Sequence, residues 1–414
     1  MEHATATGTR ATDCIQNGGG AHFRLVRARA GAARSARVES VPGRIAPAPS
    51  FNGLPAFRTT SHVRRRSGPH ATLQNPFPMN PLKAVSLFAA AAFVCALAQA
   101  ADPVTLKISH QFPGSSGDTG DFRDRLVREF ARKVEDRTKG SLKFEIYPGS
   151  SLMKTNAQFS AVRKGALDLS LFPISYAGGE MAELNIGLIP GLVTSYEQGA
   201  AWPGAPVGKE FSRLLEEKGV IILTWIWQAG GVASRSTPIV EPEDSKGMKV
   251  RGGSREMDLV LKAAGAAVVS LPSSEIYAGM QTGAMDAAMT SSTSLISFRL
   301  EEVSKALTTG RGRAYWFMLE PLIMSKIVFD KLTREQQAAL VAVGKEMEPI
   351  GTAGAKADDQ LVAEVYAKAG AKVVDLTAET VARWRVLAKE ASWKDYSAKS
   401  ESCAKLMALA EEVK

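Results

Sequence analysis

The chain has 414 residues, of which 45% are hydrophobic, and it carries a formal charge of +9. Residues 1–78 contain 11 Arg, no Lys and 3 acidic residues, so 11 − 3 = +8 of that charge lies there, and Lys83 adds one more. Residues 101–414 contain 39 basic and 39 acidic side chains and are neutral, which excludes any inference from the basic composition to nucleic-acid binding by this larger part.

Residues 79–100, MNPLKAVSLFAAAAFVCALAQA, have the pattern of a signal peptide. Lys83 precedes an apolar run from Ala84 to Ala98, and Ala98-Gln99-Ala100 fits a cleavage site. The run is shorter than the roughly 20 residues that a membrane-spanning helix needs. We therefore predict Sec-type export to the periplasm, with a buried helix or a retained N-terminal anchor as the alternatives.

Residues 1–78 precede this signal and are rich in Arg, Ala, Gly and Pro, without a sustained apolar period. Because a signal peptide begins a protein, we interpret Met79 as the true start and residues 1–78 as a product of start-site choice. A disordered extension or a transit-like leader is the alternative.

Cleavage after residue 100 would leave few side chains for covalent chemistry. Residues 101–414 contain one cysteine, Cys403, and one histidine, His110. A zinc site usually needs three or four N or S ligands. The sequence has no G-x-S-x-G, no P-loop and no G-x-G-x-x-G motif. We therefore expect no catalytic residue, no metal site and no cofactor.

Strands and helices are expected to alternate along the first part of the mature chain. The predicted strands cover residues 104–111, 141–149, 166–172, 219–228, 247–253 and 266–271, and the predicted helices cover 122–140, 155–165 and 254–265. From about residue 330 the pattern is mostly helical. This alternation favours an α/β fold with largely parallel sheets, and the length favours about two domains.

A weak internal similarity links RKGALDLSL (163–171) with QTGAMDAAM (281–289). Each segment has a capping Gly, then Ala, a large apolar residue, Asp and a strand. Each strand ends in small polar residues, which include Ser175 in one case and Thr290 in the other. We predict two lobes of similar plan that direct polar loops to one cleft, although a similarity this short can also arise by chance.

The segment GMKVRGG (247–253) places Arg251 at the end of a short strand and removes the side chains from the next two positions. Ligands of open α/β sheets sit beyond the carboxyl ends of the strands. A guanidinium can bind a carboxylate through two parallel hydrogen bonds. Arg251 is therefore a candidate carboxylate ligand, and a salt bridge to a neighbouring acid such as Glu275 is the alternative.

Residues 247–289 resemble the signature region of the extracytoplasmic solute-binding proteins of TRAP transporters. The segments KGMKVR (246–251), SEIY (274–277) and MQTG (280–283) fill the places of three motifs of that family. The segment GSLKFEIYPGSSL (140–152) is similar to a segment of the family's first lobe. The resemblance covers about residues 104–350.

This resemblance implies a two-lobed α/β clamshell that is crossed by a long helix and closes on a small organic acid. Lobe 1 would comprise residues 103–228 plus about 317–356, and lobe 2 residues 229–316 plus about 357–414. Arg251 matches the arginine that holds the ligand carboxylate in the family. The loaded protein would dock on the small and large TRAP membrane subunits, and it would not be an enzyme.

Four further positions are candidate ligand contacts. Gln111 ends the first strand, where family members often place a polar contact. Ser175 and Thr290 end the two similar strands, and Thr290 stands where many relatives have Asn. Trp227, with Trp225, could form the wall of a site for an apolar or aromatic ligand, or both rings could pack in the core.

The sequence leaves alternatives open for the ligand and for the function of the protein. Some relatives have a second arginine where this chain has Gly230-Gly231-Val232, which favours a simple monocarboxylate. The chain could instead be a binding protein for a sensor or another transporter. It could also be a secreted enzyme that uses Asp168 and Asp286, although such aspartates after capping glycines often bond to neighbouring backbone.

Overall fold

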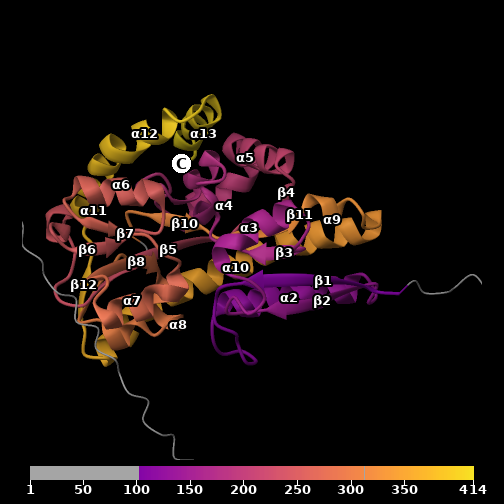
Figure 1. Cartoon of the computed structure of the whole chain (residues 1–414), viewed down its shortest axis with the longest axis horizontal. Helices are drawn as coiled ribbons and strands as arrows, with labels where there is room; N and C mark the ends of the chain where they lie inside the picture. Colours follow the sequence, from indigo (N-terminus) through magenta and orange to yellow (C-terminus); the bar gives the residue numbers. More distant parts are fainter. Residues whose placement is uncertain (1–101, 312) are drawn as a thin grey trace, which may run out of the picture. The chain divides into compact units, whose positions relative to one another are not determined.

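The computed structural model describes residues 102–311 and 313–414, which lie in one compact unit of the chain. The predicted leader (1–78) and signal peptide (79–100) fall outside these residues. Two β-sheets with flanking helices form the fold (Figure 1). The predicted α/β class is therefore confirmed.

The first sheet has five strands in the order β2-β1-β3-β11-β4. Its strands are β1 (Val104–His110), β2 (Leu142–Tyr147), β3 (Leu169–Leu171), β4 (Val220–Thr224) and β11 (Leu322–Ser325). Strand β1 is parallel to β2 and β3, and β11 is antiparallel to β3 and β4. The helices between these strands are α2 (Phe122–Arg137), α3 (Thr155–Arg163), α4 (Tyr196–Ala201) and α5 (Pro206–Glu217).

The second sheet has the order β12-β9-β5-β8-β6-β7, and β10 pairs with β5 outside this path. Its strands are β5 (Trp227–Ser234), β6 (Lys249–Arg251), β7 (Ala267–Val269), β8 (Ala287–Ser291), β9 (Ala306–Thr309), β10 (Phe317–Leu319) and β12 (Lys372–Asp375). Strand β6 is parallel to β7 and β8, whereas β5 is antiparallel to β8, β9 and β10. The helices of this half are α6 (Arg255–Ala263), α7 (Ile276–Thr282), α8 (Ser292–Ser297) and α11 (Ala378–Ala388).

The predicted strand 219–228 is wrong, because the chain changes sheets within it. Strand β4 ends at Thr224, Trp225 and Ile226 form a link, and β5 begins at Trp227 in the other sheet. Both link residues are buried, so the apolar run continues through the crossing and hydrophobicity did not mark the break. Strand β5, which follows this link without an intervening helix, is antiparallel to its neighbours. The alternation of strands and helices did not predict this antiparallel strand.

Helix α10 (Arg334–Lys368) is 35 residues long and contacts both halves of the fold. Thr333 and Gln336 form a capping box at its start, and Pro349 lies inside it. It packs against α2 and β4 of the first half and against α8 and β5 of the second (Figure 1). The predicted long crossing helix is therefore confirmed.

The remaining helices are α9 (Lys326–Phe329), α12 (Lys394–Ser397) and α13 (Glu401–Glu411), and α13 packs on α5. The chain thus passes between the sheets at the β4–β5 link, between β10 and β11, and along α10. The exact lobe boundaries, 103–228 plus about 317–356 and 229–316 plus about 357–414, stay a prediction.

The predicted similarity between the two halves extends to their hydrogen bonds. Asp168 precedes β3 and its Oδ2 accepts from the Lys107 N–H of β1 at 2.7 Å. Asp286 precedes β8 and its Oδ2 accepts from the Lys249 N–H of β6 at 2.8 Å. In each half an aspartate after a glycine helix cap therefore joins two parallel strands. These carboxylates bond to backbone, as the structural alternative to catalysis predicted.

Candidate functional site

Arg251 ends β6, and its side chain is fully buried. Its Nε donates to the Leu271 carbonyl oxygen at 3.0 Å, Nη1 to the Met289 carbonyl oxygen at 2.7 Å, and Nη2 to the Tyr176 hydroxyl oxygen at 2.6 Å. All three acceptors are neutral. No carboxylate of residues 102–311 and 313–414 forms an ion pair with this guanidinium, so the predicted alternative of a salt bridge to Glu275 does not occur there. The charges of Asp258 and Glu320 still interact with it from a longer distance.

The two glycines after Arg251 make room for the guanidinium and for the turn into α6. Gly253 has φ +92°, and a Cβ atom there would lie 2.7 Å from Arg251 Nη1. A Cβ atom at Gly252 would lie 2.3 Å from Asp258 Oδ1. The Ser254 hydroxyl then caps α6, as the sequence indicated. A side chain at either glycine would therefore displace a polar group of this site.

Arg123, on α2, is also fully buried, but it has two acidic partners. Its Nη2 lies 2.7 Å from Asp121 Oδ2, and its Nη1 lies 3.0 Å from Glu320 Oε2. Burial alone would lower the pKa of Arg123, but the two carboxylates outweigh this effect and raise it. Arg123 is therefore neutralised by its own ion pairs, whereas the hydrogen-bond partners of Arg251 are all neutral.

Tyr176 joins the two sheets at Arg251. It lies in the short helix η1 (Ile174–Ala177), which follows β3 of the first sheet. Its hydroxyl oxygen accepts from Arg251 Nη2 at 2.6 Å and from the Ser273 N–H at 3.0 Å. Arg251 ends β6 and Ser273 follows β7, so both donors belong to the second half. Because the oxygen accepts twice, the hydroxyl proton is free to donate, and no acceptor for it occurs within the described part of the chain.

A polar groove of about 440 Å³ lies beside this contact. Its lining residues come from both halves and include Ser175, Tyr176, Gly253, Ser254, Asp258 and Leu271. The Oδ1 atom of Asp258 is buried and has no hydrogen-bond partner in the described structure. Burial raises the pKa of Asp258 to about 7, against an opposing effect of the nearby Arg251 charge. The groove therefore holds a carboxyl group that titrates near neutral pH.

Two predicted contacts lie at the carboxyl edge of the first sheet. The Ser175 hydroxyl lies 3.5 Å from the Gly253 carbonyl oxygen, which brings it to the Arg251 side of the groove. Gln111 directly follows β1 and is buried, with Oε1 3.4 Å from the Thr155 hydroxyl. Its amide Nε2 has no partner within the described residues. Gln111 therefore retains donors for a further acceptor.

Thr290 lies in β8 of the second sheet and directly follows Met289, whose carbonyl oxygen accepts from Arg251. Its buried Oγ1 has no partner among residues 102–311 and 313–414. Trp316 packs beside it, since a Cβ atom on Gly230 would lie 2.2 Å from both the Trp316 ring and the Thr290 carbonyl oxygen. The indole Nε1 of Trp316 is also buried without a partner in that part.

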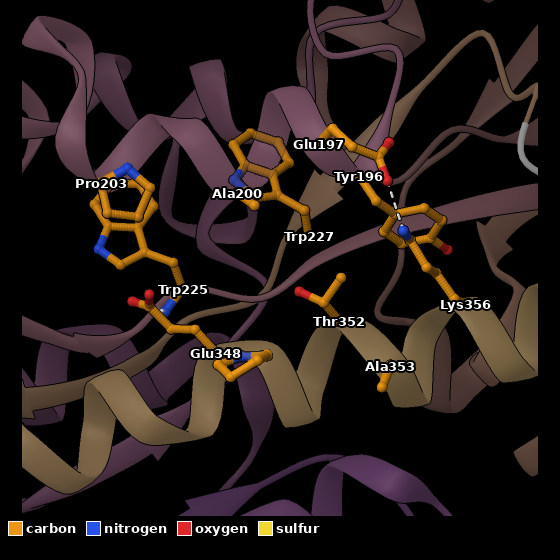
Figure 2. A pocket seen from close by; sticks show the side chains of 11 residues that line it. Tyr196, Glu197, Ala200, Pro203, Trp225, Trp227, Glu348, Thr352, Ala353 and Lys356 are labelled. Carbon is orange, nitrogen blue, oxygen red and sulfur yellow. Dashed lines mark hydrogen bonds and ion pairs between the residues drawn. The ribbon is translucent and has the colours of Figure 1, made fainter.

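Trp227 lies apart from these residues. It begins β5, and Thr290 pairs with Gly231, four residues further along, which corresponds to about 13 Å of strand. Trp227 lines a second cavity of about 480 Å³ together with Trp225 and residues of α4 and α10 (Figure 2). The structure thus brings Arg251, Ser175 and Thr290 to one region and places Trp227 in another.

Sequence reasoning missed Tyr176, Arg123 and Glu320. Tyr176 follows the predicted contact Ser175 directly, so the polar exit of β3 could have drawn attention to it. Arg123 falls in the first turn of an amphipathic helix, where an arginine is usually solvated. Glu320 is 197 residues away from Arg123 along the chain, and no local pattern connects the two.

Other chemistry-bearing groups have ordinary structural partners. His110 Nε2 lies 3.0 Å from Asp124 Oδ1, and Cys403 is buried. Within the described ranges, no group of three or more His, Cys, Asp or Glu is placed to hold a metal ion. No helix in those ranges combines the length and the apolar character needed to cross a membrane.

The chain is similar to bacterial proteins that are described as solute-binding or periplasmic binding proteins. Residues 120–399 match the family described as bacterial extracellular solute-binding protein, family 7. A solute-binding protein of Albidiferax ferrireducens is 69% identical over 307 residues, which cover 74% of this chain and 91% of that protein. The C4-dicarboxylate-binding periplasmic protein DctP of Rhodobacter capsulatus is 26% identical over 289 residues, 69% of this chain and 84% of that protein.

A crystal structure of a TRAP periplasmic solute binding protein from Rhodoferax ferrireducens, with bound malonate, has 69% sequence identity and a TM-score of 0.74. The alignment covers 74% of this chain and 98% of that one. The two-lobed arrangement predicted from the sequence resemblance is therefore confirmed.

Proposed function

Because the chain belongs to family 7 of the bacterial extracellular solute-binding proteins and is a TRAP-type solute receptor, we propose that it binds a small organic acid whose carboxylate pairs with Arg251. The observation that carries this proposal is the complete burial of a guanidinium that has no ion pair in the described structure. A buried charge that lacks an ion-pair partner costs several kcal/mol. A ligand carboxylate would supply the missing anion.

The donors for this carboxylate are already in place. A guanidinium has five N–H groups, and the hydrogen bonds to Leu271, Met289 and Tyr176 occupy three of them. We assign the two remaining N–H groups and the free Tyr176 hydroxyl proton to the ligand. Gln111 Nε2, Ser175 Oγ and Thr290 Oγ1 are proposed contacts for the rest of the molecule.

Malonate is the first ligand to test, because the relative with 69% identity was crystallised with it. Malonate has two carboxylates, whereas the absence of a second arginine at residues 230–232 led us to expect a monocarboxylate. The unpartnered donors on Gln111 and Thr290 are neutral groups that can bind a second carboxylate without another arginine. We therefore propose a small dicarboxylate rather than a monocarboxylate.

We further propose the cellular setting that this family implies. Residues 79–100 would direct export to the periplasm, and the loaded receptor would deliver its ligand to the TRAP membrane subunits. The protein would act as a receptor and not as an enzyme. Incubation with malonate, followed by NMR of the solution, should show the acid unchanged, and conversion of the acid would contradict this part.

Isothermal titration calorimetry tests the proposed role of Arg251. Malonate should bind the wild type, and its neutral diamide should bind far more weakly. Arg251→Met should weaken malonate binding by roughly 2–5 kcal/mol, the range for truncating one partner of a buried charge pair. Arg213→Met is the matched control, because it removes the same charge from an exposed arginine on α5. Wild-type affinity in Arg251→Met would overturn the proposal.

A further inference from the structure

A second cavity lies where the chain crosses between the sheets. It is separate from the polar groove beside Arg251 that Ser175, Tyr176 and Asp258 line, called the Arg251 groove. It measures about 480 Å³ and is bounded by α4, η3 (Trp202–Gly204), the β4–β5 link and α10. Figure 2 shows its lining side chains above helix α10. The size falls within the roughly 300–1,000 Å³ of small-molecule sites.

Aromatic side chains form the wall of this cavity. Trp225, Trp227 and Tyr196 line it together with small or ring-shaped apolar residues such as Pro203. Both indole rings pack on a further aromatic ring, with centroids 4.9 Å apart for Trp227 and Trp202 and 5.9 Å apart for Trp225 and Phe211. The cavity therefore offers fixed π faces, which attract cations more strongly than they attract anions or neutral molecules.

Glu348 supplies negative charge at one end of the cavity. Figure 2 shows its carboxylate beside Trp225, and its Oε1 accepts from the Trp225 N–H at 3.3 Å. Glu348 is half-buried and forms no ion pair within the described residues, and burial raises the pKa of its carboxyl group. Glu346, two residues earlier, is exposed and lies 2.9 Å from Arg137 Nη1. Glu348 thus has no ion-pair partner within the described residues, although the charge of Lys345 acts on it from the same helix.

The other end of the cavity is already neutral. Lys356 Nζ lies 2.6 Å from Glu197 Oε1 and 5.5 Å from the centroid of the Tyr196 ring. This lysine shows that the aromatic wall accepts a cation on its face. Since Lys356 is paired, it leaves no positive charge to recruit an anion, and the unpaired charge of the cavity is that of Glu348.

We propose that this cavity binds a small organic cation, an ammonium group on an apolar or aromatic body, with the ammonium between Glu348 and the Trp225 ring. Its ligand has the opposite charge to the acid expected at Arg251, so the two sites do not compete. The β4–β5 link and α10 both run from one sheet to the other, so an occupant would contact the segments that join the sheets.

Benzylammonium is the probe, and calorimetry with tryptophan fluorescence is the measurement. Benzylammonium should bind saturably and change the tryptophan fluorescence. Neutral benzyl alcohol lacks the charge and should bind at least about tenfold more weakly. Glu348→Gln should reduce benzylammonium affinity to that of benzyl alcohol. Glu346→Gln, the matched control on the same helix, should retain it. Absence of saturable binding to the wild type, or unchanged affinity in Glu348→Gln, overturns the proposal.

A second variant separates this site from the Arg251 groove. Ala353 is an exposed residue of α10 that lines the cavity, so Ala353→Phe should fill the space without disturbing the core. Benzylammonium binding should be lost in this variant while malonate binding is retained. Benzylammonium binding that survives Ala353→Phe would place the cation elsewhere and contradict the proposal. Malonate titration of the same samples shows separately whether the Arg251 groove functions.

Discussion

Replacing Tyr176 with Phe tests whether the contact between the two halves depends on one hydroxyl. The Tyr176 oxygen accepts from Arg251 Nη2 at 2.6 Å and from the Ser273 N–H at 3.0 Å. Phe fills nearly the same volume, and the edge-to-face contact of this ring with Phe172, at 6.1 Å between centroids, should persist. The substitution therefore removes two hydrogen bonds and leaves the packing in place.

The magnitude follows from the kinds of hydrogen bond that are lost. The bond from the arginine is charge-assisted and contributes about 1.5–3 kcal/mol, and the bond from the backbone N–H contributes about 0.5–1.5 kcal/mol. The proposed hydrogen bond from the Tyr176 hydroxyl to the ligand would also be lost. Water in the groove can replace part of the lost hydrogen bonding. We therefore expect a net loss of about 2–3 kcal/mol in ligand binding, or roughly 30- to 150-fold in Kd.

Calorimetric titration of Tyr176→Phe with malonate measures this loss. The unliganded variant should melt close to the wild type, because Arg251 and Ser273 can bind water when the halves separate. The matched control is Tyr147→Phe, whose hydroxyl binds Glu145 on β2 at 2.7 Å. A Kd within twofold of the wild type for Tyr176→Phe would show that the hydroxyl does not couple the halves to the ligand, and the reasoning would fail.

Three further substitutions test other parts of the structure. Arg123→Met leaves two buried carboxylates without their cation and should lower the free energy of unfolding in urea by about 3–5 kcal/mol, and a loss under about 1 kcal/mol would contradict the ion-pair account. Gly230→Ala places a Cβ against Thr290 and Trp316 and should destabilise by about 1–3 kcal/mol in the same assay; wild-type stability would refute this contact. Burial raises the pKa of Asp258 from 3.8, its ordinary value, to about 7 in the folded protein. Protonation of Asp258 therefore stabilises the fold at low pH, and this contribution is lost as the pH rises from about 4 to 7. Asp258→Asn should therefore gain stability relative to the wild type across that interval, and a pH-independent difference between the two would refute the assignment.

The sequence predicted local elements well where the apolar pattern changes at the element boundary. The strand predicted at 104–111 is β1, and the helix predicted at 122–140 is α2, which ends at Arg137. The strand predicted at 219–228 failed because Trp225 and Ile226 are buried in the link between the sheets, so the pattern continues while the direction changes. Periodicity reports burial, and a buried crossing has the same apolar signature as a strand.

The part of the site that depends on adjacent residues was predictable, and the part that depends on distant segments was not. Arg251 follows an apolar strand and precedes two glycines, so its place at a sheet edge could be read from adjacent residues. The acceptors of its guanidinium come from residues 176, 271 and 289, which the fold brings together from separate segments. No local pattern could show that these acceptors are neutral, and that property supports the proposed ligand.

The contrast between Arg123 and Arg251 gives a physical reason why ligand and lobe contact should depend on each other. Arg123 contacts residues of both halves and brings its own carboxylates, so its burial is compensated without a ligand. Arg251 contacts Tyr176 of the other half and forms no ion pair within the described residues. Burial of an unpaired charge opposes contact between the halves, and a bound carboxylate removes this penalty. An acid should therefore shift the protein toward the state in which the two halves are in contact, by as much as the acid prefers to bind that state. Saturating acid should also raise the melting temperature.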